Sequence, residues 1–323
     1  MLKSLQLPKQ LLEIENLVAF LALFVGVIAI SFAAIFIKFS EAELSSTATV
    51  FNRLWIATLV LGIGNGIQLI VSHLKSEDKL KKSPVYTTRT IGYLLLLTVF
   101  YIAFQCTWAW SLTQTGIAIS TLLHNLTPIF ISLGAWLVFR EKLERRFMMG
   151  MVLAIAGASE LGLEGLQVTS GELKGDFAAL ISAVLYGGYI LVIGQLRSTL
   201  NATTILMWSS LIGTVIVLPI LLVTQDQLFP SSGAGWLAVI ALALICHVIG
   251  LWLVIYSLDR LSASFVALFL VLDPFFTAVE AWIIFSESLS LLSWLALFIS
   301  LFGIYLALCS QSIQKPTGSQ VNE

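Results

Sequence analysis

Two carboxylates lie in one apolar stretch in the C-terminal part of the sequence. Asp273 and Glu280 are seven residues apart, which on a helix puts both side chains on one face, about 10 Å from each other. A carboxylate inside an apolar helix is costly, so it indicates a function by default. The pair could bind a substrate ammonium group or carry a coupling proton. Alternatively, each could be part of a buried polar pair that holds helices together.

Arg53 is a cation inside another apolar stretch, about six residues from its outer end, at an expected depth that matches that of Glu280. Three interpretations are open. The guanidinium could pair with Glu280, it could bind a substrate carboxylate, or it could snorkel to the membrane interface.

Other polar groups fall at inner depths of the predicted spans. His124 and His247 could relay protons, because imidazole titrates near neutral pH, or each could simply be hydrogen-bonded to a neighbour. Polar-tipped side chains that suit either the wall of a cavity for an organic ligand or helix packing are Asn125, Trp108, Tyr186 and Tyr189.

The motifs of membrane-embedded enzymes are missing from the sequence. It contains no His-Glu-x-x-His zinc motif, no Gly-x-Gly-Asp protease motif and no Walker A loop. We therefore predict no catalytic residue, no metal site and no cofactor.

Composition indicates which solvent surrounds the chain. The sequence is 58% hydrophobic and 11% charged, whereas soluble domains are about a quarter charged. The bilayer is therefore the expected environment. The net charge of −1 points to no charged partner, so the expected partners are lipid and a small-molecule substrate, with no nucleic acid. The sequence favours no particular oligomeric state.

We expect an all-α integral membrane protein with ten transmembrane helices, since a span needs about 20 apolar residues. The ten predicted spans are 17–38, 47–71, 90–111, 116–139, 147–163, 176–196, 203–223, 234–257, 262–285 and 291–310. With the N-terminus in the cytoplasm, 14 of the 17 Lys and Arg residues fall on the cytoplasmic side and two on the other side. The positive-inside rule therefore predicts that both termini are cytoplasmic, in a bacterial-type plasma membrane.

A repeat organises the chain. Residues 126–143, LTPIFISLGAWLVFREKL, and residues 272–289, LDPFFTAVEAWIIFSESL, share eight identities at an offset of 146 residues. The copies are five spans apart, so the second enters the membrane from the opposite side. Inverted repeats of this kind are typical of secondary transporters. The predicted organisation is a cytoplasmic N-terminal segment, a first five-helix repeat, an extracytoplasmic connector, a second five-helix repeat and a cytoplasmic tail, over 1–16, 17–163, 164–175, 176–310 and 311–323.

The repeated residues include prolines and glutamates. Pro128 and Pro274 lie inside apolar runs, where each should kink its helix and free the backbone carbonyl four residues earlier. Glu141 and Glu287 fall where their helices leave the membrane. We expect each to cap the N-terminus of a neighbouring helix, whose dipole favours a negative charge; the next span begins a few residues later in each case.

The two repeated segments resemble the EamA family of the drug/metabolite transporter superfamily. The stretches RLWIATLVLG (53–62) and GDFAALISAVLYGGYILVIGQL (175–196) are similar to that family as well. The resemblance implies two five-helix EamA repeats around a central cavity, and export of amino acids, other metabolites or drugs.

These observations predict a secondary active transporter that moves small organic metabolites, such as amino acids or drug-like molecules, by alternating access. A passive channel is the alternative, and a membrane-embedded enzyme is a further one. Because the scaffold is repeated, chemistry is expected at three positions where the copies differ: Thr127 against Asp273, Gly134 against Glu280 and His124 against Leu270.

Overall fold

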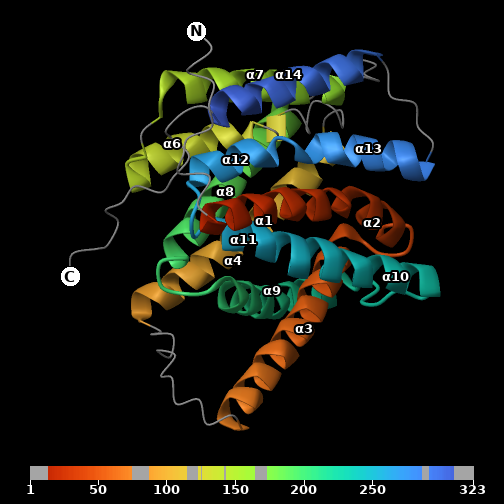
Figure 1. The fold of residues 1–323 in the computed structure, drawn as a ribbon. Coiled ribbons are helices and arrows are strands. Elements are labelled where there is room, and N and C mark those ends of the chain that lie inside the picture. The colour runs from red at the N-terminus through yellow and green to blue at the C-terminus, as the bar shows by residue number, and fades with distance from the viewer. Residues whose placement is uncertain are drawn as a thin grey trace.

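The computed structural model describes residues 14–74, 87–114, 123–124, 126–141, 143–163, 173–285 and 291–308, which form helices joined by short connections (Figure 1). Helices suit these apolar sequences because lipid offers no hydrogen-bond partner to an exposed backbone. The elements are α1 (Ile14–Ser31), α2 (Ala33–Ser40), α3 (Ser46–Leu74), α4 (Thr88–Gln114), α6 (Thr127–Phe139), α7 (Arg145–Leu163), α8 (Leu173–Leu196), α9 (Ala202–Thr224), α10 (Gly233–Ala241), η3 (Leu242–Leu251), α11 (Trp252–Ser257), α12 (Ala263–Leu270), α13 (Asp273–Phe285) and α14 (Leu291–Leu308).

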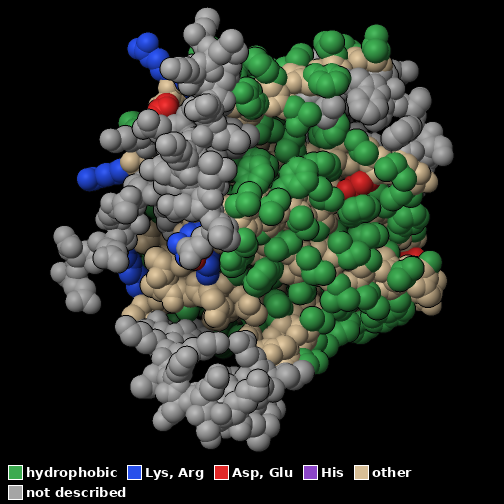
Figure 2. All heavy atoms as spheres, in the orientation of Figure 1, with side chains coloured by type: hydrophobic (Ala, Val, Ile, Leu, Met, Phe, Trp, Pro, Cys, Tyr) green, Lys and Arg blue, Asp and Glu red, His purple; other side chains and the backbone are tan. Residues whose placement is uncertain are grey.

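Six helical segments within the described part of the chain are long and apolar enough to cross a membrane. They are Asn16–Ser40, Ser46–Gly66, Thr88–Trp108, Leu173–Leu196, Ala202–Thr224 and Gly233–Ser257, and Thr127–Phe139, Ala263–Thr277 and Phe298–Ala307 are shorter apolar helices. Figure 2 shows that hydrophobic side chains cover most of one face, with Lys and Arg gathered along one edge. An apolar belt bordered by charge is the surface that a bilayer requires.

Two apolar runs are interrupted rather than gently kinked. In the second repeat α12 ends at Leu270 and α13 starts again at Asp273, with Pro274 as its second residue. In the first repeat α6 starts at Thr127, with Pro128 as its second residue. Proline is tolerated in the first turn of a helix, where the missing N–H would have had no partner. Each proline therefore opens a new helical segment partway along the run.

The first apolar run is also interrupted, without any proline. α1 ends at Ser31 and α2 starts at Ala33. The Ser31 hydroxyl donates to the carbonyl of Ile28 at 2.7 Å, a local side-chain bond that competes with regular helical pairing. Interrupted helices at membrane depth are stable only where they face protein or a cavity.

The two repeats are interleaved. Each main helix of the first repeat packs most closely against helices of the second: α1 against η3 and α11, α3 against α9, α4 against α8, α6 against α8 and α12, and α7 against α14. Figure 1 shows α7 and α14 lying together along one side of the bundle. If each helix is replaced by its counterpart in the other repeat, the α4–α8 pair becomes the pair of α1 with η3 and α11. The α3–α9 and α7–α14 pairs each consist of two counterparts, so they stay unchanged. This pairing is the one expected of two repeats related by a pseudo-two-fold axis.

Glycine allows the α7–α14 pair to approach closely. A Cβ built on Gly303 would lie 2.5 Å from the carbonyl oxygen of Gly150 and 2.5 Å from the backbone nitrogen of Ala154. Small residues at such crossings let backbones touch, which is a main source of helix association in membranes.

Candidate functional site

Two cavities among the described residues bear on function. The larger has a volume of about 450 Å³ and lies toward the end of the bundle where α2 meets α3, here called the α2–α3 end. Its lining comes from α2, α3, α4, α9, η3 and the connection between α2 and α3, and includes Arg53, Gln105 and Trp108. A volume of this size suits a small organic molecule.

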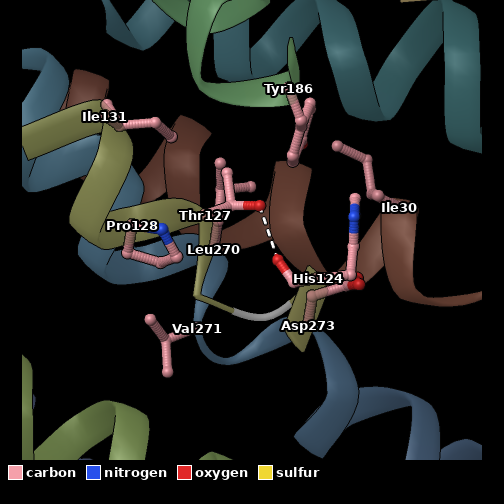
Figure 3. Close-up of a pocket in the computed structure, with 9 residues that line it drawn as sticks. All are labelled: Ile30, His124, Thr127, Pro128, Ile131, Tyr186, Leu270, Val271 and Asp273. Atoms are coloured by element: carbon pink, nitrogen blue, oxygen red, sulfur yellow. Dashed lines mark hydrogen bonds between the residues drawn. The ribbon is translucent and has the colours of Figure 1, made fainter. Parts of the chain in front are cut away.

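The smaller cavity, of about 70 Å³, lies where the helix interruptions meet (Figure 3). It is lined by residues at the end of α1, around the start of α6, on α8 and on both sides of the α12–α13 interruption: Ile30, His124, Thr127, Pro128, Ile131, Tyr186, Leu270, Val271 and Asp273. Several waters or a small ion could fill such a volume.

A stack of rings links the two cavities. The His124 ring lies between Trp108, with centroids 5.1 Å apart, and Tyr186, with centroids 5.8 Å apart. Its Nδ1 shares a 2.8 Å hydrogen bond with the Ser182 hydroxyl. Trp108 lines the larger cavity, whereas His124 and Tyr186 line the smaller one. The stack therefore joins a residue on the wall of one cavity to two residues on the wall of the other.

The backbone carbonyl of His124, four residues before Pro128, has a partner. Thr127 donates its hydroxyl to the carbonyl oxygen of His124 at 2.6 Å, the contact drawn in Figure 3. This side-chain bond satisfies a carbonyl that lies before the first turn of α6, and it fixes His124 relative to the start of that helix.

The two carboxylates of α13 lie beside the interruption in the first run. Glu280 is 7% exposed, and one of its oxygens lies 2.6 Å from Ser31 Oγ, whose single hydroxyl proton is shared between Glu280 and the Ile28 carbonyl. Thr277 donates to the Ser31 carbonyl oxygen at 3.1 Å. One oxygen of Glu280 and one of Asp273 are buried and have no hydrogen-bond partner among the described residues. The structure therefore brings Asp273 and Glu280 to the same helix but places only Asp273 on the wall of the smaller cavity.

Arg53 does not pair with Glu280. The ion pair found among the described residues joins Arg197 and Asp259, and Glu280 binds Ser31 instead. Depth in the membrane suggested the Arg53–Glu280 pair, but two helices can match in depth and still face different parts of a bundle. Arg53 faces the larger cavity and is 8% exposed, which also argues against snorkelling to the interface.

His247 and Tyr189 are buried but line neither cavity. His247 Nε2 shares a 3.0 Å hydrogen bond with the Ser210 hydroxyl, and its ring packs edge-on against Tyr101 at 5.9 Å. It lies in η3, a segment with the wider π-helical turn that is frequent near functional sites. Tyr189 stacks on Tyr186 at 6.0 Å, so it supports the ring stack from behind. Asn125 and Glu287 lie outside the described residues.

The opposite end of the bundle, where α8 meets α9, is tied by polar contacts. Glu141, 4% exposed, accepts hydrogen bonds from the backbone N–H groups of Ala263 and Ser264, at 3.0 and 3.3 Å. Arg197 pairs with Asp259 at 3.3 Å. The helix whose first turn Glu141 binds is α12 of the other repeat, not the helix that follows Glu141 in the chain.

A comparable contact occurs at the α2–α3 end. Glu43, in the connection between α2 and α3, accepts hydrogen bonds from the backbone N–H groups of Ser231 and Ser232, at 2.9 and 3.0 Å, and from both hydroxyls, just before α10. These bonds, the Ser232 side chain first, lower the pKa of Glu43 to about 2. At each end a carboxylate of the first repeat therefore binds a helix start of the second.

Sequence reasoning missed Ser31, Ser182 and Glu43. Ser31 and Ser182 are small hydroxyl residues within long apolar runs, where serine usually bonds to its own helix. Glu43 shows a weak signal, since it is acidic in a short connection and residues 230–235, PSSGAG, have the composition of a helix start.

Comparison with known proteins decides the family. The model of the EamA-like transporter family matches residues 17–161 and again residues 173–309. The chain belongs to this family. The double match covers both repeats, and the proteins below are similar in sequence or fold.

The uncharacterized transporter YxxF of Bacillus subtilis (strain 168) is 24% identical to this EamA protein over 73% of each chain. The pseudopaline exporter CntI of Pseudomonas aeruginosa (strain PAO1) is 23% identical over 78% of this chain and 82% of its own. One crystal structure superposes with a TM-score of 0.74 over 90% of this chain and 96% of its own, at 16% identity, which shows a shared fold. Together with the apolar helices, these relatives identify an integral membrane transporter of the EamA family.

Proposed function

We propose that this EamA protein is a secondary active transporter of small organic metabolites, in which ten spans in two inverted repeats alternate between two openings. The observation that supports this most strongly is the asymmetry of the two ends. Carboxylate contacts join the repeats at both ends, through Glu43 and through Glu141, but the larger cavity lies at the α2–α3 end. Because the repeats are interleaved, the opposite arrangement can form by tilting of the same helices.

We assign the α2–α3 end to the extracytoplasmic side of a bacterial-type plasma membrane. With cytoplasmic termini, the α8–α9 end carries the basic residues Arg140, Arg145, Arg197 and Arg260, as the positive-inside rule requires. In this arrangement the structure corresponds to an outward-open state.

Counterflow tests the carrier function. Purified protein would be reconstituted in vesicles preloaded with an unlabelled metabolite, and uptake of the same labelled metabolite would be followed. A carrier that exposes one site alternately should take up label faster, and transiently above equilibrium, when the other side is loaded. Uptake that rises linearly with concentration and ignores the preload would identify a passive channel, and recovery of a chemically altered product would identify an enzyme.

A coupling proton is the second element of the proposal. Asp273 and Glu280 each have a buried oxygen without a partner in the described chain, beside the interruption at Ser31. We assign the proton to Asp273, which lines the smaller cavity, with Glu280 holding the interruption in place.

Asp273→Asn tests this assignment in the same vesicles. The variant should still catalyse exchange of metabolite at equal concentrations, but it should lose the acceleration that an imposed pH gradient gives the wild type. Asp226→Asn is a matched control, because Asp226 is a carboxylate at the α2–α3 end bonded to Ser45. Gradient-driven uptake that survives in Asp273→Asn would remove this residue from coupling.

A further inference from the structure

Arg53 is a buried cation without a hydrogen-bond or ion-pair partner among the described residues. It lies on α3, seven residues after Ser46 and therefore about 10 Å into the bundle along the helix. It makes no ion pair or hydrogen bond with any described residue, and its Nε is buried without an acceptor. A guanidinium out of water needs a compensating anion or hydrogen-bond acceptors, and this one lines a cavity large enough to admit them.

A second donor on the same wall also lacks an acceptor. The indole Nε1 of Trp108 is buried without a hydrogen-bond partner in the described part of the chain. Gln105 lies three residues earlier on α4, so its amide is on the same helix face. Its Nε2 makes only a long contact, 3.5 Å, with the hydroxyl of Tyr101. The hydrogen-bond donors Arg53, Trp108 and Gln105 thus line one cavity. Arg53 and Trp108 each have a buried N–H group without an acceptor among the described residues.

Glu41, the acidic residue in the lining of this cavity, lies away from Arg53. Glu41 is exposed in the connection between α2 and α3 and accepts a hydrogen bond from Ser46 Oγ at 2.5 Å. Ser46 starts α3, so Glu41 is about 10 Å from the level of Arg53. The cavity therefore has a positive, donor-rich floor and a negative mouth.

We infer that the larger cavity recognises its substrate by an anionic oxygen group, such as a carboxylate, bound at Arg53 with help from Trp108 and Gln105. This inference rests on the proposed transport function and names the chemical class of the substrate. The planar guanidinium matches a carboxylate with two parallel hydrogen bonds. The remainder of the substrate lies against apolar side chains such as Val50 and Ile102, and is neutral or cationic toward Glu41.

Binding of three molecules of one shape tests the inference without requiring transport. The probes are 4-phenylbutyrate, its neutral amide and 4-phenylbutylamine, titrated at about 1–20 mM, the range expected for ligands of this size. Thermal stabilisation and quenching of tryptophan fluorescence would be followed in nanodiscs. The carboxylate should bind wild type about tenfold more tightly than either analogue, since hydrogen bonds to a charged acceptor are the strong ones.

Variants assign the preference to Arg53. Arg53→Gln should abolish it, Arg53→Lys should retain part of it because a point charge remains, and Trp108→Phe should weaken carboxylate binding while keeping the ring. Arg89→Gln is the control, since Arg89 lies at the other end of α4 over the Tyr93 ring. Arg53→Lys keeps the test valid if Arg53→Gln does not fold.

Three outcomes would overturn the inference: equal binding of the three probes by wild type, no binding of any probe, or an unchanged carboxylate preference in both Arg53 variants. A lipid phosphate is the other source of an anionic oxygen. If adding phosphatidylglycerol to phosphatidylcholine nanodiscs displaces 4-phenylbutyrate, the group at Arg53 belongs to lipid and the substrate assignment fails. A carboxylate preference without counterflow would reject transport and leave the anion site in place.

Discussion

Replacing Glu141 by glutamine should release the closed end of the bundle. One carboxylate oxygen accepts from Ala263 N–H, and the other accepts from the N–H and, at 2.6 Å, the hydroxyl of Ser264. Glutamine keeps the shape but loses the charge, and it turns one acceptor oxygen into a donor that faces another donor. Hydrogen bonds to a buried charge contribute about 1.5–3 kcal/mol each, so we expect a loss of about 3 kcal/mol from this contact. If the contact exists only while this end is closed, the substitution raises the population of the open state relative to the closed state roughly a hundredfold.

Cysteine labelling measures that gain. Ser257, fully buried near the same end, would be replaced by cysteine in a background where Cys106, Cys246 and Cys309 are serine. Its alkylation by a membrane-impermeant maleimide should be up to a hundredfold faster in Glu141→Gln. The control is again Asp226→Asn, a carboxylate with one hydroxyl contact at the opposite end.

Two results would refute the reasoning in different ways. A lower melting temperature with unchanged labelling would mean that Glu141 stabilises every state equally and ties neither end specifically. Unchanged melting and unchanged labelling would mean that the charge on Glu141 contributes nothing to the first turn of α12.

Three further predictions concern the ends, the helix contacts and the interrupted helix. The pKa of Glu43 is lowered from 4.5 to about 2 in the folded protein, so its stabilisation is present above pH 4.5 and is lost as pH falls toward 2; the melting temperatures of wild type and Glu43→Gln should therefore differ at pH 6 and converge as the medium is acidified. Gly303→Ala should destabilise by about 1–3 kcal/mol or more because its Cβ overlaps backbone, whereas Gly64→Ala, with nothing within 4 Å, should not, as chemical denaturation in detergent would show. Thr127→Val should cost about 1–2 kcal/mol by leaving the His124 carbonyl unpaired, and Thr127→Ser should restore most of it in the same assay.

Hydropathy predicted where the helices lie but not where they are interrupted. The predicted span 47–71 corresponds to α3, Ser46–Leu74, because a long apolar run must form a helix in lipid. The predicted span 17–38 is instead divided at Ser31. The groups that bind this interruption, Glu280 and Thr277, are 249 and 246 residues away in the chain. A local pattern cannot contain that information.

Depth along the membrane was a partial guide to the site. It correctly grouped Trp108, His124 and Tyr186, whose rings stack. Depth wrongly suggested a pair between Arg53 and Glu280. Two residues at the same depth can still face different sides of a helix bundle, and depth alone does not distinguish these cases. The repeat directed attention to positions where the copies differ, and Asp273 does line a cavity. Gly134 instead contacts Leu191, which fills the space a side chain would need.

The interleaving of the repeats has a consequence for biosynthesis. The helices α1, α3, α4 and α7 find their closest packing partners in the second half of the chain. During translation, the first repeat enters the membrane before those partners exist, so its small and polar faces stay exposed to lipid until the second repeat arrives. We therefore expect that neither half folds by itself. Expressed as separate polypeptides, the halves should accumulate only when they are made together in the same cell.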